Sequence, residues 1–114
     1  DNIYEEWQAH YKEKILAEAM SRSKRISQFV EEYRENPDAF AIAFEPEQMR
    51  RTILQEIAYM MQRIDSRDES FLKELKKIDS SLKTIVEASE FQWHPALEAV
   101  YSSDDFWWLY STLR

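Results

Sequence analysis

The two histidines are the residues of this chain best suited to binding a metal, and each follows a glutamate by four positions, as in Glu6 with His10 and Glu90 with His94. Imidazole and carboxylate groups are common ligands of divalent metals. Di-iron helical bundles, however, separate the glutamate from the histidine by three positions, and an aromatic residue stands there in both cases. The zinc-protease pattern is also absent. We therefore expect structural or surface histidines, no metal site and no bound cofactor.

Nucleophilic and acid–base catalysis also lack a recognisable template. The chain has no cysteine, and because it has no glycine, none of its serines lies in a glycine-flanked nucleophile elbow. The adjacent carboxylates Asp104 and Asp105 would point about 100° apart on a helix. That geometry suits a favourable charge at a helix N-terminus better than a catalytic pair. We therefore expect no catalytic residues, and we expect that the protein is not an enzyme.

The composition excludes further classes of site. Without glycine the chain forms neither a phosphate-cradling loop nor a dinucleotide-binding fingerprint, and without cysteine it has no disulfide. The 15 basic and 22 acidic residues give a net charge of −7, which disfavours binding to nucleic acid and to anionic membranes. The charges of the one basic run, Arg22, Lys24 and Arg25, point in different directions on a helix, so a solvated face is the favoured interpretation.

The length of 114 residues corresponds to a single domain, which we expect to span residues 1–114. No apolar run approaches the roughly 18 residues that cross a bilayer. No signal peptide is visible in the sequence. These features predict a cytoplasmic protein that does not bind membranes.

Residues 3–35 predict one long helix. The apolar side chains of this segment fall in a stripe about 140° wide at the α-helical period. Asn36-Pro37 ends the helix, because a residue before proline disfavours the helical conformation. Residues 36–45 are expected to form a short connector that plugs its aromatic side chains into the core. The stripe comprises Tyr4, Trp7, Tyr11, Ile15, Ala19, Ile26, Phe29, Val30 and Tyr33.

A second long helix is predicted over residues 46–90. Its apolar residues recur in a heptad pattern, which is typical of helices packed at a shallow crossing angle. The pattern keeps its phase through the polar stretch 65–70, which favours one helix about 67 Å long. The alternative is a break at Ser66, where Ser66 and Glu69 match a capping box. The heptad positions are Leu54, Ile57, Met61, Ile64, Asp68, Phe71, Leu75, Ile78, Leu82, Ile85 and Ser89.

The remaining residues are rich in aromatic side chains. His94-Pro95 is expected to end the long helix, and two short helices are predicted after it, over about 95–101 and 104–113. The predicted fold class is therefore all-α. We expect a long antiparallel helical hairpin or bundle with coiled-coil-like heptad packing, capped by the short C-terminal helices.

Polar residues interrupt both long helices at positions that an antiparallel arrangement would bring to about the same level. Two interpretations stay open. The residues form a partly buried polar layer that specifies register, at some cost in stability, or each faces water at the edge of the bundle. The residues concerned are Glu18, Arg22, Arg67 and Asp68.

Two groups of apolar residues lie off the predicted core faces. Leu16 and Met20 lie off the main stripe of the first helix, and Trp107 and Trp108 lie at or beyond the edge of the last one. Large exposed apolar patches tend to mark interaction sites. We therefore predict that at least one group contacts another chain, either a second copy or a different protein. The alternative is that the two tryptophans are lids on the core.

The leading functional hypothesis is a non-enzymatic protein–protein interaction module. It would be a small, acidic cytoplasmic adaptor, regulator or inhibitor that presents a helical surface to a partner. The first alternative is an acidic, immunity-type inhibitor that competes with nucleic acid for a basic site. That function needs rows of carboxylates, whereas acids and bases are interleaved through 46–90. The second alternative is a metal-binding helical bundle.

Overall fold

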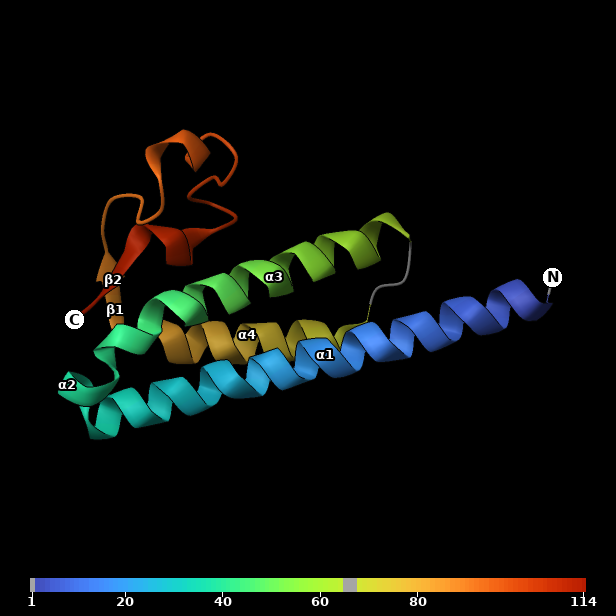
Figure 1. Ribbon diagram of the computed structural model, residues 1–114, viewed down its shortest axis with the longest axis horizontal. Coiled ribbons are helices and arrows are strands. Elements are labelled where there is room, and N and C mark those ends of the chain that lie inside the picture. The colour runs from blue at the N-terminus through green and yellow to red at the C-terminus, as the bar shows by residue number, and fades with distance from the viewer. Residues whose placement is uncertain (1, 65–67) are drawn as a thin grey trace.

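The computed structural model describes residues 2–64 and 68–114, and most of these residues are helical (Figure 1). The first element, α1 (Asn2–Glu35), is a continuous helix of 34 residues. It contains no glycine or proline, and it ends immediately before the Asn36-Pro37 pair. Asn36 caps the next helix, α2 (Pro37–Phe40), because its side-chain oxygen accepts a hydrogen bond from the backbone N–H of Ala39 at 3.3 Å.

The chain reverses direction through α2 and a short 3-10 helix, η1 (Ala41–Ala43). The next helix, α3 (Phe44–Arg63), then runs back along α1 (Figure 1). The ring of Phe44 stacks on the ring of Phe29 with their centroids 6.1 Å apart. This contact fixes the reversal to the core.

The structure does not contain the single helix predicted over 46–90. Instead α3 ends at Arg63, and α4 (Glu69–Lys83) begins after Asp68. Asp68 has an extended backbone, and its Oδ1 accepts a hydrogen bond from the backbone N–H of Phe71 at 2.9 Å. A helix begins readily where an aspartate satisfies these free N–H groups. The predicted cap at Ser66 lies outside the described residues.

The heptad pattern has the same phase on both sides of this break, and α1 packs against both α3 and α4 (Figure 1). The heptad positions of both helices therefore face one core. Ile64 is an exception, since it lies just past the end of α3 and is 56% exposed. The buried residues of this core are Ala19, Ile26, Phe29, Val30, Tyr33, Leu54, Met61, Phe71, Leu75, Ile78, Leu82, Ile85 and Val86.

The prediction of two C-terminal helices, over 95–101 and 104–113, is wrong. The first segment contains only a single 3-10 turn, η2 (Pro95–Leu97). The second segment forms another 3-10 turn, η3 (Trp107–Tyr110), and then a strand, β2 (Ser111–Leu113). This strand pairs antiparallel with β1 (Val86–Ala88), which occupies the expected end of the long helix.

The physical reason for this difference lies in the side chains around η3. An α-helix would point Trp107 and Trp108 about 100° apart and leave one of them outside the core. The observed turn and strand bury Phe106, Trp108 and Leu109 together in a second apolar cluster. The fold is thus mostly helical, with a small two-stranded sheet in the described residues.

Candidate functional site

The two ends of the helical bundle formed by α1, α3 and α4 differ in how they are covered. At one end the C-terminal segment packs over the helices, and we call this the closed end (Figure 1). There Tyr33 donates a hydrogen bond from Oη to the carbonyl of Arg114 at 3.1 Å, and Arg114 Nε donates to the carbonyl of Val86 at 2.9 Å. At the other end α1 projects past α3 and α4, and we call this the open end.

A buried ion pair anchors the closed end. Arg51 of α3 is 3% exposed and binds Asp79 of α4 through two hydrogen bonds, of 2.7 Å from Nε and 2.9 Å from Nη2. Its guanidinium lies 4.1 Å from the centroid of the Trp108 ring. A buried arginine needs such partners, because an unpaired charge away from water is costly.

Trp108 is held by further hydrogen bonds from α3. Its indole N–H donates to Thr52 Oγ1 at 2.9 Å, and its carbonyl accepts from Gln48 Nε2 at 2.7 Å. The side chain is 2% exposed. The prediction of an exposed interaction patch at Trp108 is therefore wrong, because the indole fills the space between the ion pair and the aromatic cluster.

The structure does not bring the other predicted interface residues together into one patch. Leu16 is half-buried and packs against the main core. Trp107 is also half-buried, with Lys83 Nζ 5.0 Å from its ring centroid. Met20 alone is exposed, at 42%. The contact of these residues with another chain stays a prediction.

The residues of the predicted polar layer have separate roles. Arg22 Nη1 lies 3.5 Å from Glu18 Oε2, and these side chains are 34% and 63% exposed respectively. Asp68 caps α4, and Arg67 lies outside the described residues. The observed positions of Glu18 and Arg22 favour the water-facing interpretation.

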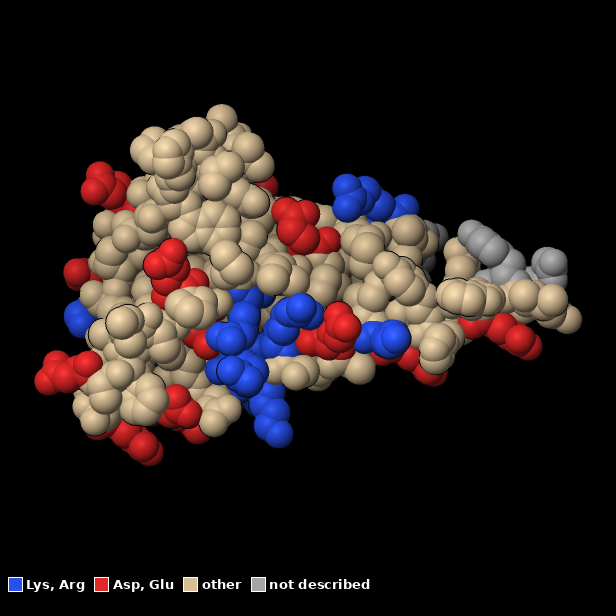
Figure 2. All heavy atoms as spheres, in the orientation of Figure 1, with Lys and Arg blue, Asp and Glu red and all other residues tan. Residues whose placement is uncertain are grey.

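Lys and Arg side chains gather over the middle of the bundle, with Asp and Glu side chains beside them (Figure 2). Besides the Glu18–Arg22 pair, Glu47 is bound to Arg50. Burial raises the pKa of Glu47 above its usual 4.5, and the nearby Arg50 and Arg25 offset only part of that effect. Arginines therefore offset the negative charge of both Glu18 and Glu47.

Neither glutamate–histidine pair has the geometry of a metal site. Both His10 and His94 are exposed, and His94 Nδ1 accepts a hydrogen bond from the backbone N–H of Ala96 at 3.1 Å. Within residues 2–64 and 68–114, no three histidine or carboxylate side chains are grouped so that they could hold a metal ion. Among the described helices, none is long and apolar enough to cross a membrane.

The open end exposes apolar side chains in an ordered row. The N-terminal part of α1, residues 2–15, is named the arm, and its row continues the stripe that is buried from Ala19 onward. Ile3 is 68%, Trp7 70% and Tyr11 55% exposed. The amphipathic pattern therefore continues toward the N-terminus beyond the part of α1 that α3 and α4 cover.

A hollow of about 200 Å³ lies where the arm meets the end of α3. Tyr11 and Ile15 of α1 form one side of it, and Met60, Met61 and Ile64 on or just past α3 form the other. Apolar groups dominate the lining, so the hollow suits an apolar side chain.

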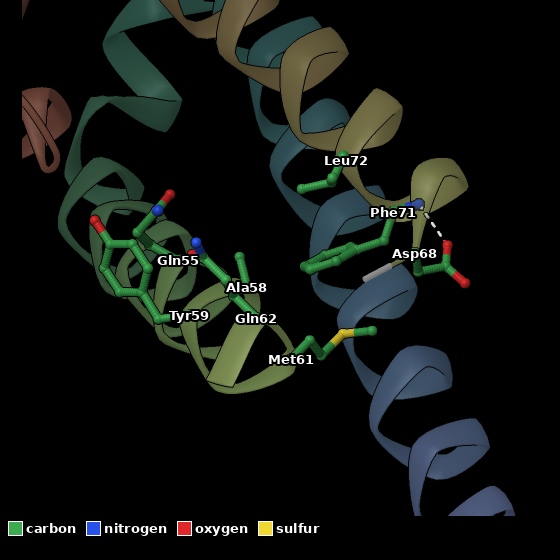
Figure 3. Close-up of a pocket in the computed structure, with 8 residues that line it drawn as sticks. All are labelled: Gln55, Ala58, Tyr59, Met61, Gln62, Asp68, Phe71 and Leu72. Carbon is green, nitrogen blue, oxygen red and sulfur yellow. Dashed lines mark hydrogen bonds between the residues drawn. The ribbon is translucent and has the colours of Figure 1, made fainter. Parts of the chain in front are cut away.

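A second hollow, of about 240 Å³, lies on the other side of Met61, between α3 and α4 (Figure 3). Phe71 and Leu72 of α4 face Ala58 and Met61 of α3 across it. The Asp68 carboxylate points away from it to the N–H of Phe71, as the dashed line in Figure 3 shows. Together the two hollows make the open end an apolar, indented surface.

Sequence reasoning missed the arm as a site, although the signal was present. The stripe is about as long as the whole first helix, whereas α3 and α4 contain 20 and 15 residues against the 34 of α1. A break in the second helix therefore leaves part of the stripe uncovered. No protein-family model matches this chain, and searches of curated proteins and solved structures return no match.

Proposed function

We propose that this protein is a non-enzymatic protein–protein interaction module, a small cytoplasmic adaptor, regulator or inhibitor, and that it binds another polypeptide at the open end. The observation that carries the proposal is the apolar row of the arm, which stays 55–70% exposed at Ile3, Trp7 and Tyr11. Aromatic side chains of this kind supply most of the binding energy in many protein interfaces.

The shape of the open end supports a helical or extended polypeptide as the partner. A helix lays its apolar face into a hydrophobic groove through side chains spaced three or four residues apart. The two hollows on either side of Met61 offer apolar pockets of about 200 and 240 Å³ for such side chains. Gln55 and Gln62 line the hollow between α3 and α4, and their amide groups suit hydrogen bonds to a partner backbone.

Site-specific photo-crosslinking tests the proposal. A photoreactive amino acid replaces Trp7 in one variant and Ile42 in a matched control, since Ile42 is 90% exposed but lies in η1 near the closed end. After irradiation in the native extract, mass spectrometry identifies the crosslinked peptides. We expect the Trp7 variant to join specific peptides of another chain that the Ile42 variant does not. Equal, unspecific crosslinking from the two positions would contradict the proposal.

A further inference from the structure

We propose that a polar hollow near the closed end binds a small zwitterion, a molecule that carries an amine and a carboxylate separated by a short apolar chain. The hollow lies between α1, η1 and the start of α3 and has a volume of about 420 Å³. Small-molecule sites usually have volumes of roughly 300–1,000 Å³. The hollow shares no residue with the arm or with the two hollows of the open end, so this site is independent of the proposed function.

The charged side chains that line the polar hollow are sorted by sign along its length. On α1, Arg25 and Glu32 are seven residues apart, which places them on one face of the helix and about 10 Å apart along its axis. Because α1 runs toward the closed end, Glu32 is the nearer of the two to that end (Figure 1). On α3, which runs the other way, Glu47 is nearer the closed end and Arg50 lies about one turn further from it. Two glutamates therefore lie toward one end of the hollow and two arginines toward the other.

The arginine end of the hollow suits a carboxylate. Arg25 is exposed, and it takes part in neither of the ion pairs beside it, Glu18–Arg22 and Glu47–Arg50. A guanidinium has five N–H donors in a planar fork, and the contact of Arg50 with Glu47 uses only its Nη1. Arginine forks match the two oxygens of a carboxylate and bind them through short, charge-assisted hydrogen bonds.

The glutamate end of the hollow has an unused acceptor for an amine. Glu47 is 6% exposed, and its Oε2 is enclosed without a hydrogen-bond partner among the described residues. A buried acceptor without a donor costs free energy, which a bound ammonium group would recover. A small rotation of the Glu47 carboxylate would present this oxygen to the amine.

The surroundings of Glu47 also favour a positive charge at this end. Burial raises the pKa of Glu47, and repulsion from the half-buried Glu32 adds to the rise, whereas Arg50 and Arg25 lower it. Two carboxylates that repel each other are stabilised by a cation placed near both. An ammonium group bound there therefore adds the favourable charge that the two arginines supply only in part.

Apolar side chains form most of the remaining wall of the hollow. Phe29 and Phe40 line it together with Ala43 and Pro46. The ring of Phe29 is held in place by stacking on Phe44, so this part of the wall exists before a ligand binds. Methylene groups of a ligand gain free energy by packing on such a surface. The combination of separated charges and an apolar wall favours an amino acid with a chain between its two charged groups.

Isothermal titration calorimetry with three simple probes tests the site. The first probe, 6-aminohexanoate, carries both charges on an apolar chain, whereas hexanoate lacks the amine and hexylamine lacks the carboxylate. We expect 6-aminohexanoate to bind at least about tenfold more tightly than either of the others, because each end of the hollow then forms charge-assisted hydrogen bonds. The amide signals that shift in NMR spectra on binding should belong to residues 25–32 and 40–50.

Matched variants test the two ends separately. Arg25→Gln and Glu32→Gln should each weaken the binding of 6-aminohexanoate about tenfold, because each removes one charged partner. The controls Lys24→Gln and Glu31→Gln remove the same charges at exposed neighbouring positions, which point about 100° away on α1. Both controls should bind like the unmodified protein. Circular dichroism checks that all four variants remain folded.

Three outcomes would overturn the proposal. They are the absence of binding at millimolar 6-aminohexanoate, an equal affinity for the three probes, and an equal loss of affinity in the variants and their controls. The last would show that the overall charge of the protein, and not the hollow, attracts the probe. None of these outcomes bears on the crosslinking test of the open end.

Discussion

At the residue scale, the ion pair between Arg51 and Asp79 connects three parts of the chain. Arg51 lies on α3, Asp79 lies on α4, and the guanidinium stacks over Trp108 of the C-terminal segment. The guanidinium of Arg51 is almost fully buried, so removing Asp79 leaves a buried positive charge without its partner. The ion pair therefore helps to determine how the C-terminal segment packs on α3 and α4.

Replacing Asp79 with alanine should lower the free energy of unfolding by about 2–3 kcal/mol, because it leaves Arg51 unpaired. The figure lies below that of a fully buried pair, since the Asp79 side chain is 20% exposed. Unfolding in urea, monitored by tryptophan fluorescence, measures this free energy. Lys76→Ala, an exposed change on the same helix, should cost under about 0.5 kcal/mol. A similar small loss for Asp79→Ala would show that the pair does not anchor the closed end.

Glu47 gives the stability a specific dependence on pH. Burial raises its pKa above 4.5, so the folded state holds the proton more tightly than the unfolded state. As pH rises from about 4.5 through the folded pKa, this group's contribution to stability is lost. Glu47→Gln cannot titrate, so the stability of the variant relative to the unmodified protein should increase as pH rises from 4 to 7.

Chemical unfolding at several pH values measures this difference. Glu45→Gln, at an exposed carboxylate two residues away on α3, is the matched control. A difference for Glu47→Gln that stays flat or falls as pH rises would contradict the assignment. The attraction of the bound Arg50 opposes the effect of burial, so it reduces the size of the expected difference without changing its sign.

At the element scale, the break between α3 and α4 decides the architecture. It converts a predicted rod into two helices that both pack on α1. Asp68 is the residue that begins α4, through its hydrogen bond to the N–H of Phe71. Glu69 and Ser70, which follow it in the first turn of α4, are exposed, so a helix can begin there with little loss of buried apolar surface.

Asp68→Ala should therefore destabilise the protein by about 1 kcal/mol, as removal of a helix N-cap usually does. Hydrogen exchange should show lower protection of the amide of Phe71, which donates to the aspartate. Asp68→Ser keeps a capping oxygen and should retain most of the stability. Equal losses in the two variants would indicate that capping is not what Asp68 contributes.

At the scale of the whole molecule, apolar residues are distributed unequally between the two ends. The closed end and the middle of the bundle bury two apolar clusters, although single side chains such as Ile42 and Val100 stay exposed there, whereas the open end exposes the whole row of the arm. Because the interior is closely packed, truncating a buried side chain should lower the free energy of unfolding strongly, whereas truncating a side chain at the open end should lower it little.

Ile26→Ala and Phe71→Ala should each cost about 2–5 kcal/mol, because both side chains are fully enclosed. Ile64→Ala should cost less than about 1 kcal/mol in the monomer, although the heptad pattern predicts it in the core. Unfolding at low protein concentration separates this from any effect on association. Equal costs at Ile64 and Ile26 would show that the end of α3 is buried after all.

The sequence by itself determined the features that depend on local chemistry and periodicity. The extent of α1 follows from its stripe and from Asn36-Pro37, and the start of α3 lies within two residues of the predicted position. Most heptad positions are buried, because the period alone fixes which side chains share a helix face.

Only the tertiary structure decided the features that depend on distant parts of the chain. The strands pair Val86 with Leu113, and Arg51 meets Asp79 28 residues further along. Neither contact can be recognised from the local sequence. A three-residue strand is unstable without its partner strand, and a charged residue that will be buried in an ion pair looks in the sequence like a charged residue that faces water. The arm became a candidate site for the same reason, because the lengths of α3 and α4 determine which part of the α1 stripe stays uncovered.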